Sequence, residues 1–151
     1  MNLLGRFLAL SGTDRRLFIC AWCLLGYYKL AITLRPVMNL IGHLERVAGT
    51  EPAPEADAFE QDEAARIGRM VARAAAHTPW PSLCLVQVLT TQRLMASRKL
   101  PGQFTFGAML CGDRSAPDRK LAAHAWLRCG DLVVSGAGGH ENYAPTWAFR
   151  W

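Results

Sequence analysis

The chain has 151 residues, of which 51% are hydrophobic and 19% charged. This length and composition predict one folded domain, with or without a helical appendage, and exclude disorder of the whole chain. The net charge is +5, but residues 51–63 hold six of the twelve acids and no base, which leaves +11 on the rest of the chain. Such an excess suits an acidic peptide or a membrane surface. Nucleic acid is not an expected partner, because no basic motif with interleaved aromatic residues is present.

The cysteines are five in number, and no secretory signal accompanies them. An odd count without a signal predicts a reducing, cytoplasmic compartment rather than a disulfide scaffold. The segment Leu17–Leu34 is apolar, but its uninterrupted run ends after 12 residues at Tyr28. Because a bilayer crossing needs about 20 residues, we expect a buried or interfacial helix. Association with a membrane through this helix is the alternative.

The first 50 residues are predicted to form an apolar helical segment. Ser11 and Asp14 have the spacing of a capping box, which predicts a helix that continues to Arg35, just before a proline. A second, shorter helix is expected over residues 37–48. The Gly and Pro content of residues 49–54 predicts a linker.

Residues 55–151 are predicted to form the main domain, which begins with an amphipathic helix over residues 57–77. A helix over residues 83–99 follows, with Ser82 as its N-cap, and it is apolar nearly all round in its first half, as a buried helix is. The hydrophobic period then changes to two, which predicts antiparallel strands. These strands are 103–110, 121–129 and 132–135, with a charged loop over 112–120 and a turn at Gly130–Asp131. Helices followed by antiparallel strands indicate an α+β fold.

Two residues of this domain could carry chemistry together. Cys84 falls in the first turn of the buried helix, where unpaired backbone N–H groups and the helix dipole stabilise a thiolate and a developing oxyanion. His124 is the one imidazole in the apolar strand Leu121–Leu127. A thiol at a helix N-terminus facing an imidazole on a sheet is the arrangement that thiol proteases and transglutaminases share. For each residue taken singly, a packing role is the alternative.

Three short sequences carry a resemblance to a known family: PSLCLVQVL at Pro81–Leu89, QRL at Gln92–Leu94 and AAHAWL at Ala122–Leu127. They resemble the transglutaminase-like proteases of lasso-peptide biosynthesis, the microcin-processing B proteins, in the form where the protease is a chain of its own. The resemblance extends over residues 66–145. It implies a papain-like core and cleavage of the leader from a ribosomally made precursor, before a separate cyclase closes the lasso ring. It also implies Cys84 as the nucleophile and His124 as the base.

The chain departs from the family pattern at the third catalytic residue, an acid that lies on the strand after the histidine. Asp131 is the nearest acid in sequence, but a position in the two-residue turn places it about 20 Å along the strand from His124. In the register that this turn sets, Trp126 faces Ser135, and Ser135 shares a face with His124. The positions expected to carry the acid are then Ser135 and Gly136.

Ser135 is therefore the expected orienting residue for the imidazole, in place of the acid. Asp131 and Glu141 stay open as alternatives, since the glycines of Gly136–Gly139 give the following loop the freedom to fold back. No cofactor or metal is expected, because Cys20 and Cys23 have no further ligands nearby and His140 is isolated in the sequence.

The family's other usual component is a leader-recognition domain of winged-helix type, and residues 1–60 are too helical and apolar to form one. The expected partners are therefore the precursor peptide, a separate leader-recognition protein and the lasso cyclase. Leu17–Leu34 is a candidate surface for docking to a partner or to a membrane. Two further functions remain open. One is an acyltransferase on the same fold, and the other is a catalytically impaired scaffold that binds precursor and cyclase together.

Overall fold

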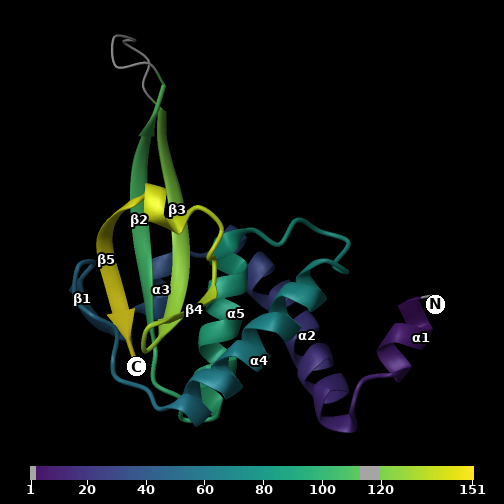
Figure 1. The fold of residues 1–151 in the computed structure, drawn as a ribbon. Helices are drawn as coiled ribbons and strands as arrows, with labels where there is room; N and C mark the ends of the chain where they lie inside the picture. Colours follow the sequence, from purple (N-terminus) through teal and green to yellow (C-terminus); the bar gives the residue numbers. More distant parts are fainter. Residues whose placement is uncertain (1–2, 113–119) are drawn as a thin grey trace.

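The computed structural model describes residues 3–112 and 120–151. Within these residues, helices pack against one face of an antiparallel sheet with the strand order β1-β5-β2-β3-β4 (Figure 1). The helices are α1 (Leu3–Leu8), α2 (Gly12–Leu34), α3 (Val37–Ile41), α4 (Ala58–Ala75), α5 (Cys84–Ser97) and the short 3-10 helix η1 (His140–Asn142). The strands are β1 (Glu45–Ala48), β2 (Gln103–Cys111), β3 (Lys120–Cys129), β4 (Leu132–Ser135) and β5 (Ala144–Arg150). The predicted α+β architecture is confirmed.

Helix α2 begins and ends close to where the sequence predicts. The Ser11 hydroxyl accepts the backbone N–H of Asp14 at 3.1 Å and donates to its carboxylate at 2.9 Å, so the side chains cap the first turn. The helix ends at Leu34, before the proline. One stripe of it is buried against α4 and α5, and its members are Leu17, Ala21, Leu25, Tyr28 and Ala31.

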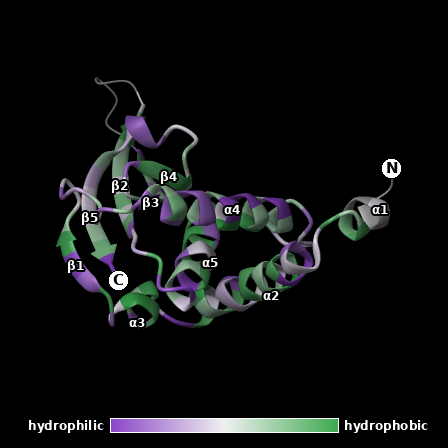
Figure 2. Cartoon of the chain, turned by 60° about the horizontal axis from the view of Figure 1, so that its bottom comes forward, coloured by the Kyte–Doolittle hydropathy of each residue, from purple (hydrophilic) through white to green (hydrophobic). Residues whose placement is uncertain are grey.

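The opposite face of α2 remains apolar and exposed. Its large exposed side chains include Ile19, Tyr27, Leu30 and Leu34, and hydrophobic residues recur along α2 and α3 in Figure 2. The helix is longer than the clean run of apolar residues at its centre, and by length and composition it is long and apolar enough to cross a membrane. Core helices of soluble proteins and N-terminal signal sequences meet the same criterion, so this is weak evidence for a membrane.

The helix predicted over residues 37–48 is wrong in its second half. Helix α3 ends at Ile41, and residues 45–48 form the edge strand β1, which pairs antiparallel with β5. Glu45 lies opposite Arg150, and Ala48 lies opposite Trp147. Four residues carry little periodicity, and the pairing partner is a distant segment, so tertiary contact decides this strand.

The strands β2, β3 and β4 were predicted correctly, and β2 pairs with β3 in unbroken register from Gln103↔Arg128 to Cys111↔Lys120. Alternation along β3 gives its two faces different surroundings. Ala125 and Leu127 belong to the hydrophobic core under α4 and α5, whereas His124 and Trp126 lie on the other face. Of the predicted charged loop over 112–120, residues 113–119 lie outside the described ones.

Helix α5 is the centre of the core. Val86, Leu89 and Met95 are fully buried or nearly so, and the helix packs against α2, α4, β3 and β4. Leu17 and Ile41 from the N-terminal helices belong to the same hydrophobic cluster as these residues. The predicted division of the chain near residue 50 stays a prediction, but both sides of it contribute to this cluster.

Charged groups join the helices at the surface. The Arg66 guanidinium on α4 lies 2.7 Å from the carboxylate of Asp14 on α2 and 3.2 Å from that of Glu63. Glu63 also pairs with Arg98, just beyond α5. The hydrogen bond from Arg66, assisted by one from Ser11, lowers the pKa of Asp14 from its ordinary value. The network thus connects all three long helices, although each such partly exposed pair contributes less than about 1 kcal/mol.

We predict that Gly68→Ala destabilises the fold, because α4 approaches the sheet most closely there. A Cβ atom at Gly68 would lie 2.4 Å from the backbone oxygen of Val134 on β4. We expect a loss of about 2 kcal/mol in the free energy of unfolding, measured by urea denaturation, despite the better helix propensity of alanine. Gly12→Ala is the control, since a Cβ there meets nothing within 4 Å. Equal stabilities for the two variants would contradict the close packing of α4 on β4.

Candidate active site

Cys84 is the first residue of α5, and its side chain is half-buried. The N-cap position is Leu83, whose side chain makes no capping hydrogen bond. The predicted cap, Ser82, is therefore wrong by one residue: its hydroxyl lies 3.0 Å from the Thr78 hydroxyl instead. Without a side-chain cap, the backbone N–H groups of the first turn remain available to a thiolate or an oxyanion beside Cys84.

Side-chain hydrogen bonds hold the turn that leads into Cys84. The Thr78 hydroxyl lies 2.9 Å from the carbonyl oxygen of Ala75 and 2.8 Å from that of Trp80. From inside α5, the Gln87 side-chain amide donates to the carbonyl oxygen of Ser82 at 2.8 Å. This last bond crosses the start of the helix, so it ties the backbone before Cys84 to the second turn of α5. These hydrogen bonds therefore fix the backbone that precedes Cys84 and connect it to the helix that follows, which sets where the thiol side chain starts.

His124 is held by a backbone group of the loop that follows β4. Its Nε2 atom lies 2.8 Å from the carbonyl oxygen of Gly136. A carbonyl oxygen only accepts, so Nε2 carries the proton and Nδ1 is the nitrogen left free to act as a base. The imidazole is flanked by the ring of Trp126, with centroids 6.1 Å apart, and by that of Tyr143, at 5.1 Å.

The register between β3 and β4 differs from the expected one. Cys129 pairs with Leu132 across the predicted two-residue turn, but a bulge between Leu127 and Arg128 then shifts the pairing. Ser135 consequently lies opposite Leu127 instead of Trp126. In the described part of the chain, Ser135 makes no hydrogen bond to the imidazole, and the next residue supplies the acceptor.

Neither alternative acid reaches His124 with a hydrogen bond in the described structure. Asp131 is exposed in the turn between β3 and β4. Glu141 is exposed in η1 and pairs with His140, whose Nδ1 lies 3.2 Å from its carboxylate. His140 is also less isolated than its sequence surroundings suggested, because its Nδ1 lies 2.8 Å from the Ala137 carbonyl oxygen.

Gly136 is one of the two positions where the resemblance leads us to expect an acid, and its conformation suits only glycine. Its φ is +74°, in the left-handed region, and an added Cβ would lie 2.3 Å from the carbonyl oxygen of Ala125. Gly136 thus packs directly on the backbone of β3, where its own carbonyl meets His124. A neutral carbonyl orients the imidazole as a carboxylate does, but it stabilises an imidazolium less.

Cys84 and His124 are not hydrogen-bonded to one another in the described structure. Helix α5 packs on the face of the sheet that carries Ala125, and the His124 side chain starts from the opposite face. Its Nε2 atom nevertheless reaches the carbonyl oxygen of Gly136. Gly136 follows the last paired residue of β4 and packs on the part of the β3 edge that β4 does not cover. For His124 to act as the base for Cys84, the thiol and the imidazole must approach one another at this edge of β3.

Comparison with protein families matches residues 25–148 to the Transglutaminase-like superfamily. The chain belongs to this superfamily. Comparison with curated proteins and with solved structures finds no match to the chain. Membership supports a papain-like cysteine peptidase or acyltransferase kind of function, and it agrees with helices packed on an antiparallel sheet.

This transglutaminase-like domain has a pocket of about 500 Å³ beside the His124 cluster, which sequence reasoning missed. Trp126 and Tyr143, the two rings that flank His124, both line it, together with the segment Gly49–Pro52 predicted as a linker. The buried Nε of Arg128 in this pocket has no hydrogen-bond partner among the residues that the structure describes. The approach of Tyr143 to His124 depends on the reversal of the chain after β4. The sequence therefore contains no signal for this contact beyond the presence of an aromatic residue in segment 140–145.

The other candidate ligands do not assemble into a metal site. Among the described residues, no three His, Cys, Asp or Glu side chains gather closely enough to hold a metal ion. Cys20 and Cys23 are exposed on α2. Cys129 is buried under α4, and this burial, reinforced by the charge of Glu60, raises the pKa of its thiol to about 11. Such a thiol is a packing residue.

We predict that Gly136→Asp, which introduces an acid at one of the two positions where the resemblance leads us to expect it, destabilises this transglutaminase-like domain and does not improve any activity. A left-handed φ and the clash with Ala125 together should lower the free energy of unfolding by about 3 kcal/mol. Gly138→Asp is the matched control, because a Cβ there meets nothing within 4 Å. Urea denaturation of both variants measures the difference. A Gly136→Asp protein as stable as the control would show that the loop after β4 can leave β3 freely.

Proposed function

We propose that this chain is a cysteine peptidase that removes the leader from a lasso-peptide precursor, with Cys84 as nucleophile and His124 as general base. The observation that carries the proposal is the position of Cys84 at the uncapped start of a buried helix. The superfamily supplies the class of chemistry. The resemblance of the Cys84 and His124 segments to the lasso-peptide proteases supplies the substrate.

The proposed reaction needs only these groups and water. The imidazole takes the thiol proton, and the thiolate attacks the carbonyl carbon of the scissile peptide bond. Backbone N–H groups at the start of α5 stabilise the oxyanion. The imidazolium then protonates the leaving amine, and a thioester joins the leader to Cys84. Water, deprotonated by the imidazole, hydrolyses that thioester and regenerates the thiol.

The partners and the compartment belong to the same proposal. The precursor would be presented by a separate leader-recognition protein, and the product would pass to the lasso cyclase. The exposed apolar face of α2 is the proposed docking surface, toward a partner chain or a membrane surface. All five cysteines are free, which suits the cytoplasm.

A catalytically impaired scaffold is the second candidate function. Two observations favour it: Cys84 and His124 share no hydrogen bond in the described structure, and the imidazole meets a neutral backbone carbonyl where the resemblance leads us to expect an acid. Such a scaffold would bind precursor and cyclase without cleaving either. Substitution of the thiol separates the two functions.

We predict that Cys84→Ala abolishes leader release, with a fall of at least about 10³-fold in rate, because covalent catalysis has no other nucleophile. The purified chain would be incubated with a candidate precursor and its recognition protein, and the products followed by mass spectrometry. Cys111→Ala is the control, since that free thiol lies at the end of β2, outside both the start of α5 and the face of α2 proposed for docking. A mass that corresponds to water addition indicates a peptidase, and one that corresponds to amine transfer indicates an acyltransferase. Undiminished activity of Cys84→Ala would refute the thiol mechanism.

We further predict that His124→Ala lowers the rate of leader release by about 10²-fold or more, whereas Ser135→Ala and Asp131→Ala change it less than about threefold. The reason is that the imidazole is oriented by the backbone of Gly136, which these two substitutions leave in place. Single-turnover rates at saturating precursor give the comparison. A large loss in Ser135→Ala would instead identify its hydroxyl as the orienting group.

A further inference from the structure

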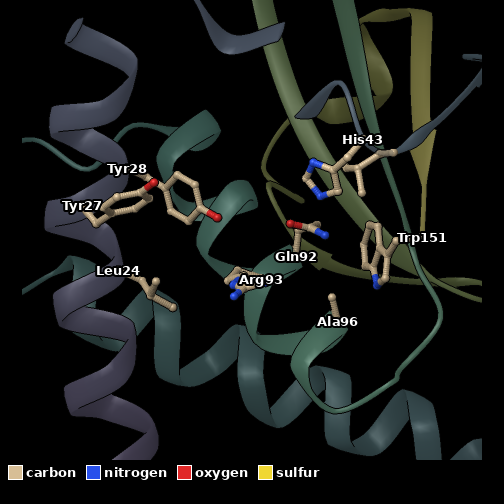
Figure 3. A pocket seen from close by; sticks show the side chains of 9 residues that line it. Leu24, Tyr27, Tyr28, His43, Gln92, Arg93, Ala96 and Trp151 are labelled. Atoms are coloured by element: carbon tan, nitrogen blue, oxygen red, sulfur yellow. The ribbon is translucent and has the colours of Figure 1, made fainter. Parts of the chain in front are cut away.

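A cavity outside the Cys84 and His124 region lies between α2, α5 and the C-terminal Trp151 (Figure 3). Its volume is about 570 Å³. Gln92 enters it from α5, two turns beyond Cys84 and therefore about 12 Å further along the helix. This cavity is thus separate from the thiol, although the same buried helix carries both.

Two polar side chains face this cavity without hydrogen-bond partners in the described part of the chain. Gln92 is only 6% exposed and Tyr28 only 9%, yet neither the amide nor the phenol is hydrogen-bonded. Figure 3 shows both side chains directed into the space between α2 and Trp151. Burial raises the pKa of Tyr28, against the opposing effect of the Arg93 charge, so the phenol is a donor at neutral pH. Because both groups open onto the cavity and have no partner among the described residues, they are available to hydrogen-bond a ligand.

The other residues that line the cavity indicate the chemical class of that ligand. Among the described residues Arg93 has no ion-pair partner, and none of the residues that line the cavity is a carboxylate, so the cavity favours an anion. The rings of Tyr27 and Trp151 form apolar walls. Trp151 is itself fixed, because its indole N–H donates to the carbonyl oxygen of Leu100 at 3.0 Å. A guanidinium, an amide and a phenol between aromatic walls suit a carboxylate next to an amide bond and an aliphatic side chain.

We propose that this cavity is an exosite for an acidic peptide segment. The segment's carboxylate binds Arg93 and the Tyr28 hydroxyl, its backbone amide pairs with Gln92, and its aliphatic side chain packs on Tyr27 and Trp151. The proposal rests on the peptide-processing function above and adds to it a second point of substrate attachment, remote from the thiol. The +11 charge of the chain outside residues 51–63 would assist the approach of such a peptide.

Binding of matched peptides tests the exosite without any cleavage. The probes are N-acetyl-Ala-Leu-Glu-Leu-Ala-amide, its glutamine twin and free glutarate, titrated by calorimetry into the full chain carrying Cys84→Ala. We expect the glutamate peptide to bind about tenfold more tightly than its twin, as charge-assisted hydrogen bonds allow. Arg93→Gln should remove this advantage, and Gln92→Leu should weaken both peptides about threefold or more.

The control is Arg16→Gln, which makes the same change of charge at an exposed arginine outside the cavity and should leave the tenfold advantage intact. Arg93 is exposed, so its variant should fold, and a thermal melt checks this. The exosite is refuted if neither peptide binds, if the two bind equally, or if the advantage survives Arg93→Gln. Glutarate binding as tightly as the glutamate peptide would refute a peptide ligand and identify a small dicarboxylate site.

The exosite and the proposed peptidase activity can fail separately. Peptide binding that depends on Arg93, without any Cys84-dependent leader release, would support the exosite and count against the peptidase. Cys84-dependent release without peptide binding would do the reverse.

Discussion

The burial of α5 is the constraint on which the rest of the structure depends. Val86, Leu89 and Met95 are buried on several sides of one helix, so α2 and α4 must cover it from one direction and the sheet from the other. A helix enclosed in this way has little freedom to slide, because each turn interdigitates with its neighbours. Its first residue, Cys84, is therefore placed by the whole core, and so is Gln92 two turns later. Chemistry at the start of the helix and recognition further along it would share one rigid support.

The sequence predicted most of what is encoded locally. A capping box located the start of α2, amphipathic periodicity located α4, and the change from helical to alternating hydrophobicity located β2 and β3. The two candidate catalytic residues were visible because each has a distinctive neighbourhood, a cysteine before a buried helix and a histidine within an apolar strand. These inferences needed only nearby residues, and local periodicity is the strongest information that one sequence contains.

What the sequence did not predict depends on contacts between distant segments. Strands β1 and β5 pair residues about a hundred positions apart, and β5 contains a proline that weakens its strand pattern. The bulge at Leu127 has no sequence signal of its own, yet it moves Ser135 out of the expected register. The partner of His124 is a carbonyl group, which every residue possesses, so residue type could not identify it. The expected acid is a side chain, whereas the acceptor that His124 has is a backbone carbonyl.

The backbone nature of that acceptor has a consequence for how the site could change over time. A side-chain partner can be lost by a single substitution, and a carboxylate partner also gains a proton in acid. The Gly136 carbonyl is subject to neither event, since no substitution deletes it and it does not titrate in the accessible range. Its position depends instead on a left-handed glycine lying against β3. Heritable variation in this contact must therefore act through the path of the main chain, by lengthening, shortening or stiffening the loop after β4.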